Sequence, residues 1–134
     1  MAMKLNDGEE ILIQCQGNNI KSFMNVQQGT YYLTNQRFIF ARASKGVRFW
    51  AAPIHGFLEG WDVEFAFPYT EFSALQVGKH GFAKKYVIQT LAGVSYNVQV
   101  QKKDEWLDTL RQALVQYSGG HVMDDGAGGF YVAR

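Results

Sequence analysis

Residues 29–40, which read GTYYLTNQRFIF, are the stretch that decides the fold of this 134-residue chain. Aromatic and β-branched residues are concentrated at 30–34 and 38–40, and such side chains pack well on the pleated surface of a sheet, so 30–34 and 37–43 are expected to be strands. Between the two runs, Asn35 and Gln36 favour a tight turn. The stretch therefore predicts two antiparallel strands joined by a short connection.

Short strands and turns are also expected on the N-terminal side of this stretch. Residues 10–16 and 20–26 are apolar enough for strands, and Gly17-Asn18-Asn19 between them has the composition of a turn. A further turn is expected at Gln27-Gln28-Gly29. These residues predict a meander of four short strands.

On the C-terminal side, residues 71–77 and 86–90 predict two more strands around a turn at Gly78-Lys79-His80-Gly81. Ala92-Gly93 then closes another hairpin. Residues 94–100 alternate between apolar and polar side chains, as expected for a strand with one face in the core and one in water.

From residue 102 the apolar period changes to that of an amphipathic helix, predicted over 104–117. Asp104 or its neighbour is expected to cap its start, and Ser118-Gly119-Gly120 to end it. The Gly-rich tail, 119–134, is expected to be mobile or held by another chain, although its last apolar residues could dock as a strand. The apolar stripe of the helix consists of Trp106, Leu107, Leu110, Ala113, Leu114 and Tyr117.

The order of these motifs resembles that of GRAM domains, which are relatives of the pleckstrin-homology fold. Residues 29–40 are similar to the central signature of that family, residues 5–12 to its opening strand and residues 67–72 to its proline-led entry to the later strands. The resemblance covers 5–117 apart from 44–66. It implies a mainly β single domain over 1–134, a partly open seven-stranded barrel of two packed antiparallel sheets capped by the C-terminal helix.

The composition is that of a β-rich domain that needs no disulfide. Aromatic residues make up 15% of the chain, and the lone Cys15 is predicted to be a buried core residue. A net charge of +1 argues against a broad nucleic-acid-binding face. No signal peptide and no apolar stretch of about 18 residues is present, so a cytoplasmic protein is expected.

The sequence favours a binding module over an enzyme. His55, His80 and His121 are far apart, and the spacings typical of metal ligands, nucleophile elbows and phosphate-binding loops do not occur. Asp124-Asp125-Gly126 is interpreted as a plain turn. No catalytic residue, metal or cofactor is therefore predicted.

The first functional hypothesis is protein interaction or self-association through an aromatic insertion at 44–66. Large apolar residues outside the regular pattern favour a contact surface for a protein partner or a homo-oligomer. They could equally fold back on the barrel. The candidate interface residues are Phe49, Trp50, Phe57 and Trp61.

The alternative hypothesis is weak binding to an anionic membrane, because the family resemblance implies lipid headgroup or protein binding. Its usual basic site is the first hairpin, but residues 16–21 hold one basic residue, Lys21. A second group, Arg42, Lys45 and Arg48, is also basic. The candidate lipid contacts are the cluster Lys79, His80, Lys84 and Lys85, which predicts salt-sensitive adsorption unless these charges serve only solvation and edge protection.

Overall fold

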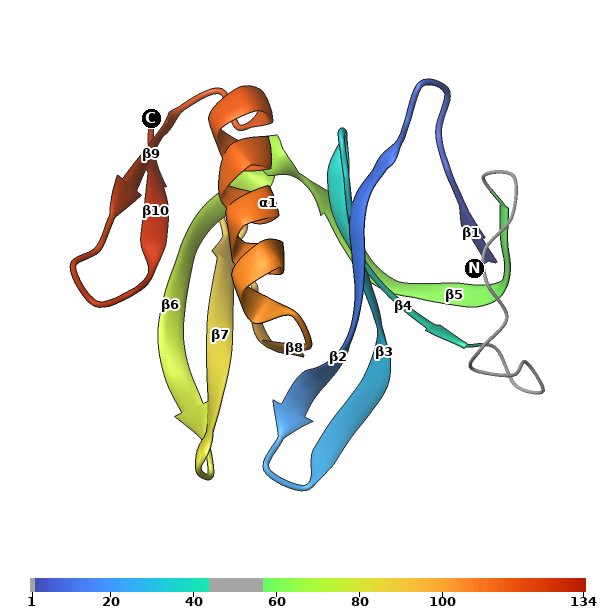
Figure 1. Ribbon diagram of the computed structural model, residues 1–134, viewed down its shortest axis with the longest axis horizontal. Helices are drawn as coiled ribbons and strands as arrows, with labels where there is room; N and C mark the ends of the chain where they lie inside the picture. Colours follow the sequence, from blue (N-terminus) through green and yellow to red (C-terminus); the bar gives the residue numbers. More distant parts are fainter. Residues whose placement is uncertain (1, 44–56) are drawn as a thin grey trace.

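The strands of the protein form one antiparallel sheet that curls on itself, with a helix packed across it (Figure 1). We describe it from a computed structural model, which defines residues 2–43 and 57–134, and side chains at 4–43 and 62–134. Within these residues the sheet has ten strands, in the order β1-β5-β4-β3-β2-β8-β7-β6-β10-β9. The expected mainly β fold with one C-terminal helix is confirmed.

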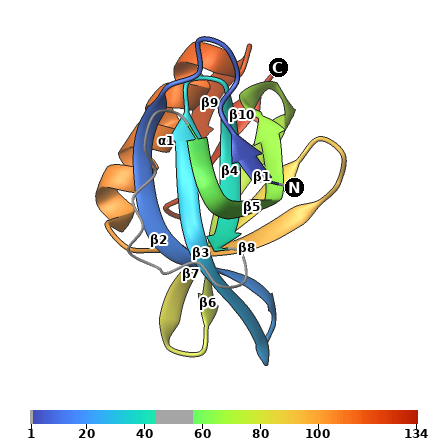
Figure 2. The same ribbon diagram turned by 90° about the vertical axis from the view of Figure 1, so that its right-hand side faces the viewer.

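The elements follow one another along the chain without long connections between β2 and β4 or between β6 and β10, as the two views show (Figures 1 and 2). Seven strands, β2 to β8, form the partly open barrel as one continuous sheet, where two packed sheets were expected, and β1, β9 and β10 extend its two edges. The bounds are β1 Ala2–Lys4, β2 Ile11–Ser22, β3 Asn25–Thr34, β4 Arg37–Ala43, β5 Phe57–Pro68, the 3-10 turn η1 Tyr69–Glu71, β6 Phe72–His80, β7 Ala83–Thr90, β8 Ser95–Val100, α1 Lys103–Tyr117, β9 His121–Asp124 and β10 Phe130–Ala133.

Two of the expected turns are wrong, because Gly17 and Gly29 lie inside long strands. β2 and β3 form one continuous hairpin in which Gly17 is paired with Gly29. A Cβ atom on Gly17 would collide with the Gln99 carbonyl oxygen of β8, and one on Gly29 would lie 2.5 Å from the Ala41 carbonyl oxygen of β4. Glycine is needed here for the close approach of strands, and the chain turns instead at residues 23–24.

Gly29→Ala is therefore expected to lower the free energy of unfolding by about 2–3 kcal/mol, in the range measured for overpacked interiors. The added methyl would also lie 2.8 Å from the Phe40 ring, so neither backbone nor core leaves room for it. Urea denaturation followed by circular dichroism measures the loss. Gly78→Ala is the matched control, because its methyl would meet the flexible Lys85 side chain at 3.4 Å and a Val87 methyl at 3.9 Å, which are ordinary contacts. Equal losses in the two variants would contradict the close-approach explanation.

The stretch at residues 29–40 is buried on both faces of the sheet. Tyr31, Leu33, Phe38 and Phe40 lie in the main core, together with Cys15. Their neighbours Tyr32 and Ile39 point to the other face, where Leu5, Ile11 and Val63 cover them. The two strands that the stretch predicts are thus the centre of the fold.

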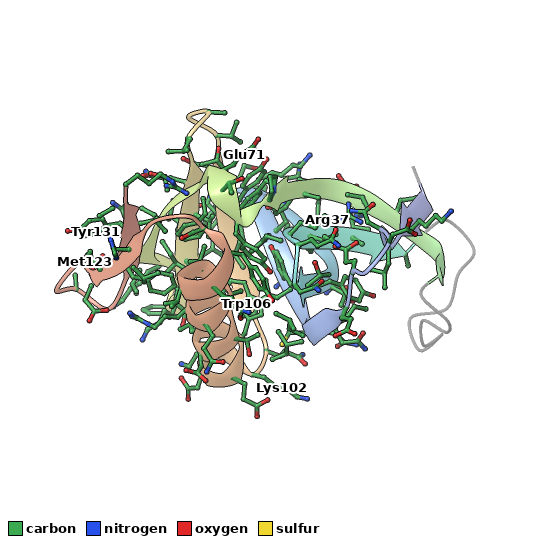
Figure 3. All side chains as sticks on the ribbon, turned by 90° about the horizontal axis from the view of Figure 1, so that it is seen from above. Arg37, Glu71, Lys102, Trp106, Met123 and Tyr131 are labelled. Carbon is green, nitrogen blue, oxygen red and sulfur yellow. The ribbon has the colours of Figure 1, made fainter. Side chains whose placement is uncertain are left out.

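Helix α1 closes the barrel with the predicted apolar stripe. Trp106, Leu110, Ala113 and Leu114 are buried, while Leu107 and Tyr117 pack at the margin of the core. The Trp106 ring lies where α1 meets the strands, in contact with the rings of Tyr31, Phe38 and Tyr86 (Figure 3). The expected cap by Asp104 is wrong, because the helix starts after Lys102, whose φ of 53° is left-handed, without any side-chain cap.

The N-terminal loop is fixed to the β3–β4 turn by a buried ion pair. The Glu9 carboxylate is fully buried and accepts hydrogen bonds from Arg37 Nε at 2.9 Å and Thr34 Oγ1 at 2.6 Å. Asn35 also binds this loop, since its side chain donates to the Gly8 carbonyl oxygen and accepts from the Glu10 amide. Residues 5–10 are therefore a loop, and not the opening strand that the resemblance implied.

The second half of the expected irregular insertion is a strand. β5 pairs with β4 along residues 61–68 and with β1 near its start. Phe65 stacks on Tyr96 with 3.8 Å between ring centroids, so this part of 44–66 belongs to the barrel. Residues 44–56 lie outside the described residues.

The C-terminal tail is ordered by its own chain. β9 and β10 form a hairpin around Asp125, whose carboxylate accepts hydrogen bonds from the amides of Ala127 and Gly129. β10 pairs with β6, and Arg111 of α1 lies 4.7 Å from the Phe130 ring centroid. The expectation of a mobile or partner-held tail is wrong, whereas the predicted strand at its end and the turn at Asp125 are present.

Candidate functional site

Two hairpins, β2–β3 and β6–β7, reach the same end of the molecule (Figures 1 and 2). Phe23, in the turn of the first, packs on His80, at the end of β6 in the second, with 5.4 Å between ring centroids. We call this end the double-hairpin tip. It comprises Lys21, Phe23, Met24, Lys79, His80, Phe82, Lys84 and Lys85.

The lysines of the double-hairpin tip have a defined arrangement on the β6–β7 hairpin. Lys79 and Lys84 are directly opposite one another in the register, and Lys85 lies opposite Gly78. Side chains alternate along a strand, so Lys79 and Lys84 share one face while Lys85 shares the other with His80. No ion pair joins these lysines to a carboxylate within the described residues. Like charges placed opposite one another in a sheet are destabilising, so folding alone does not explain them.

Large apolar side chains occupy the turns of both hairpins. Phe82 has a relative accessibility of 107%, Met24 of 87% and Phe23 of 75%. These are the three highest values among the large apolar side chains that the structure describes. Exposed apolar residues grouped at one end of a protein indicate a contact surface more strongly than the same residues scattered singly.

The electrostatics of the double-hairpin tip are one-sided, although the whole chain is nearly neutral. Residues 11–58 contain no aspartate or glutamate, and neither do residues 72–103. The two hairpins that form the tip therefore contribute four lysines and no acid. The acids of the chain lie in the N-terminal loop, β5, η1, α1 and the C-terminal hairpin.

The sequence-predicted lipid contacts are brought together, and the predicted protein interface is not tested. Lys79, His80, Lys84 and Lys85 share the β6–β7 hairpin. Of the aromatic candidates, Phe49 and Trp50 lie outside the described residues, as do Lys45 and Arg48. The strand β5 includes Phe57 and Trp61, but their side chains also lie outside the described residues. Arg42 pairs with Glu64 at 3.5 Å, away from the tip.

Sequence reasoning missed the apolar half of this site. The sequence prediction places Phe23 and Met24 inside the strand 20–26, because it assigns Gly17 and Gly29 to turns. The predicted turn at 78–81 is misplaced, because β6 continues to His80 and the chain turns at Gly81 and Phe82, so Phe82 lies outside the prediction. The signal that identifies the region is the long span without acids together with apolar residues between two strands.

Other recesses in the described part of the chain offer less chemistry. The recess of about 520 Å³ between β2, β3 and β8 is lined mainly by carboxamides, among them Gln16, Asn18 and Gln99. Burial raises the pKa of the Cys15 thiol, which disfavours the reactive thiolate. No group of three or more potential metal ligands occurs among the described residues. Within the same residues, no helix has the length and apolarity needed to cross a bilayer.

Comparison with solved structures identifies the class of fold. A structure of the N-terminally truncated linker-DH/PH domains of p115-RhoGEF matches 83% of this chain with a TM-score of 0.62 and 7% identity; the match covers 30% of that chain. The C-terminal domain of an unknown protein from Leishmania infantum matches 81% of this chain with a TM-score of 0.58 and 16% identity, over 87% of its own length.

These likenesses concern the fold alone, since both identities are low. The fold is pleckstrin-homology-like: a mainly β domain whose open antiparallel sheet is closed by one helix near the C-terminus. No protein-family model matches the sequence, and no curated protein matches it either.

Proposed function

We propose that this chain is a non-catalytic binding module of the GRAM type that attaches peripherally, from the cytoplasm, to membranes rich in anionic phospholipid. The double-hairpin tip is its contact surface. The observation that carries this proposal is the placement of Lys79 directly opposite Lys84, next to Lys85 and without any neutralising acid on either hairpin.

The energetics favour an anionic surface as the partner of these lysines. Each lysine near an anionic leaflet contributes about 1 kcal/mol, and the attraction is confined to about a Debye length. The lysines extend from strands that a ten-stranded sheet holds in place, so little ordering accompanies binding. The repulsion between Lys79 and Lys84, which is unfavourable in the free protein, is relieved when lipid phosphates lie between them.

This site differs from the usual headgroup site of pleckstrin-like domains. The β2–β3 hairpin carries one lysine, Lys21, so most of the charge comes from the β6–β7 hairpin. A broad charged surface of this kind supports salt-sensitive adsorption to anionic lipid in general, in preference to tight binding of one headgroup.

Vesicle cosedimentation tests the proposal. Lys79→Gln/Lys84→Gln is expected to weaken binding to vesicles of phosphatidylcholine and phosphatidylserine about thirty-fold, which corresponds to about 2 kcal/mol for two charges. The matched control Lys102→Asn/Lys103→Gln removes the same charge at the start of α1, and asparagine tolerates the left-handed φ of 53° at position 102. The control is expected to bind much as the wild type does.

Two outcomes would refute the proposal. One is wild-type binding at low salt that is no stronger to anionic than to neutral vesicles. The other is an equal loss in the tip and control variants, which would reflect net charge alone. Sedimentation of the protein without lipid tests the other predicted function, because self-association through the insertion would give a mass that rises with concentration.

A further inference from the structure

The double-hairpin tip has the layered order of a membrane anchor, with apolar residues foremost and cations behind them. On the β6–β7 hairpin Phe82 forms the turn, the pair His80 and Ala83 follows, and Lys79 and Lys84 come next. At about 3.3 Å per residue, these paired lysines lie two residues, or about 7 Å, behind the turn. This separation matches the depth of about 5–10 Å to which interfacial side chains enter a bilayer.

The β2–β3 hairpin repeats the same order with other residues. Phe23 and Met24 form its turn, Ser22 and Asn25 pair behind them, and Lys21 follows. The two hairpins are separate in sequence, yet the contact between Phe23 and His80 places their turns side by side. Both hairpins therefore have an apolar residue in the turn, one residue pair behind it, and then lysine.

We propose that Phe23, Met24 and Phe82 insert together into the interfacial region of an anionic phospholipid bilayer, so that the two hairpins act as one two-pronged anchor. This proposal rests on the proposed function for the choice of an anionic membrane. It adds which residues insert into that membrane and anchor the protein there. The lysines of the two hairpins remain at the level of the lipid headgroups. Their long aliphatic stems can lie against apolar surface while the ammonium groups stay hydrated.

The charge and shape of the tip favour a bilayer over a protein partner. A protein interface concentrates its apolar residues in a central patch with a mixed polar rim. Here the rim contains lysines and no acid, and the apolar residues lie on projecting turns instead of a flat face. In a bilayer the apolar turns would lie toward the acyl chains, and the lysines behind them would lie at the level of the lipid phosphates.

Serine substitutions separate insertion from adsorption, because they leave every charge in place. Phe82→Ser is expected to weaken binding to phosphatidylcholine–phosphatidylserine vesicles about ten-fold, and Phe23→Ser/Met24→Ser/Phe82→Ser by more. The matched control is Leu91→Ser, which removes an exposed apolar residue from the turn between β7 and β8. The control is expected to bind within about two-fold of the wild type.

Salt dependence gives a second readout. Raising the salt from about 0.05 M to about 0.5 M screens the lysines but not the apolar contact. The wild type is expected to keep a salt-resistant fraction of its vesicle binding, and the triple serine variant to lose that fraction. Lys79→Gln/Lys84→Gln is expected to lose mainly the salt-sensitive part.

The depth to which position 82 inserts is measured directly with the variant Phe82→Trp, bound to vesicles of lipids with brominated acyl chains. Its added fluorescence, taken relative to the wild type, is expected to be quenched, whereas that of Leu91→Trp is not. Unquenched emission from position 82, or serine variants that bind as tightly as the wild type, would overturn insertion. If binding still favours anionic vesicles in that case, the proposed function survives. If the serine variants instead abolish self-association and no vesicle binding occurs, both proposals fail.

Discussion

Replacing Trp106 with alanine is expected to lower the free energy of unfolding by about 3–5 kcal/mol, the usual cost of emptying a large buried aromatic site. The indole is fully buried and contacts the rings of Tyr31, Phe38 and Tyr86. These partners belong to strands β3, β4 and β7. The cavity would therefore open between the helix and three strands of the sheet. Urea denaturation followed by circular dichroism measures the loss.

Two control variants sharpen this test. Val115→Ala changes an exposed position of the same helix, and it is expected to alter stability by less than about 0.5 kcal/mol. Trp106→Phe keeps most of the ring contacts and removes an indole N–H that finds no hydrogen-bond acceptor among the described residues. It is expected to cost clearly less than alanine. A loss below about 1 kcal/mol for Trp106→Ala would refute the role of α1 as the plug of the barrel.

Replacing Arg37 with alanine is expected to cost about 3–5 kcal/mol at neutral pH, because it leaves the buried Glu9 carboxylate without its cation. Arg37 donates to both oxygens of that carboxylate, at 2.9 and 3.1 Å, and also to the Lys4 carbonyl oxygen. The loss therefore includes the attachment of the N-terminal loop. Arg42→Ala is the control, since its pair with Glu64 is partly exposed and is expected to contribute less than about 1 kcal/mol.

The pH dependence of this variant has a defined sign. Burial alone would raise the pKa of Glu9, but hydrogen bonds from Arg37, Thr34 and the Asn6 amide outweigh it and lower the pKa below its ordinary value of 4.5. The wild type thus gains stability from Glu9 above pH 4.5 and loses it as the pH falls through the lowered pKa. Without Arg37, burial favours the protonated acid, so the deficit of Arg37→Ala narrows on acidification. A deficit that is constant from neutral to acidic pH would contradict the ion-pair explanation.

The candidate site was only half visible in the sequence. Lys79, His80, Lys84 and Lys85 are neighbours along one chain segment, so any hairpin there would bring them together. Phe23 is more than fifty residues away from its partner His80, and no local pattern relates them. Lys21 likewise looks like an isolated charge in the sequence, because only the packing of the two hairpins brings it to the same end of the molecule as the other lysines.

The sequence by itself determined the elements whose signal is local. The apolar period of residues 106–117 specifies a helix and its buried face, and the aromatic runs around Asn35 specify two strands and their turn. Only the tertiary structure decided that Gly17 and Gly29 are sites of close strand approach, and that the C-terminal hairpin packs on β6. The reason is that glycine is favoured both in turns and where two strands approach closely. The residue type is the same in both cases, so only the neighbouring strand in the folded protein shows which role a glycine has.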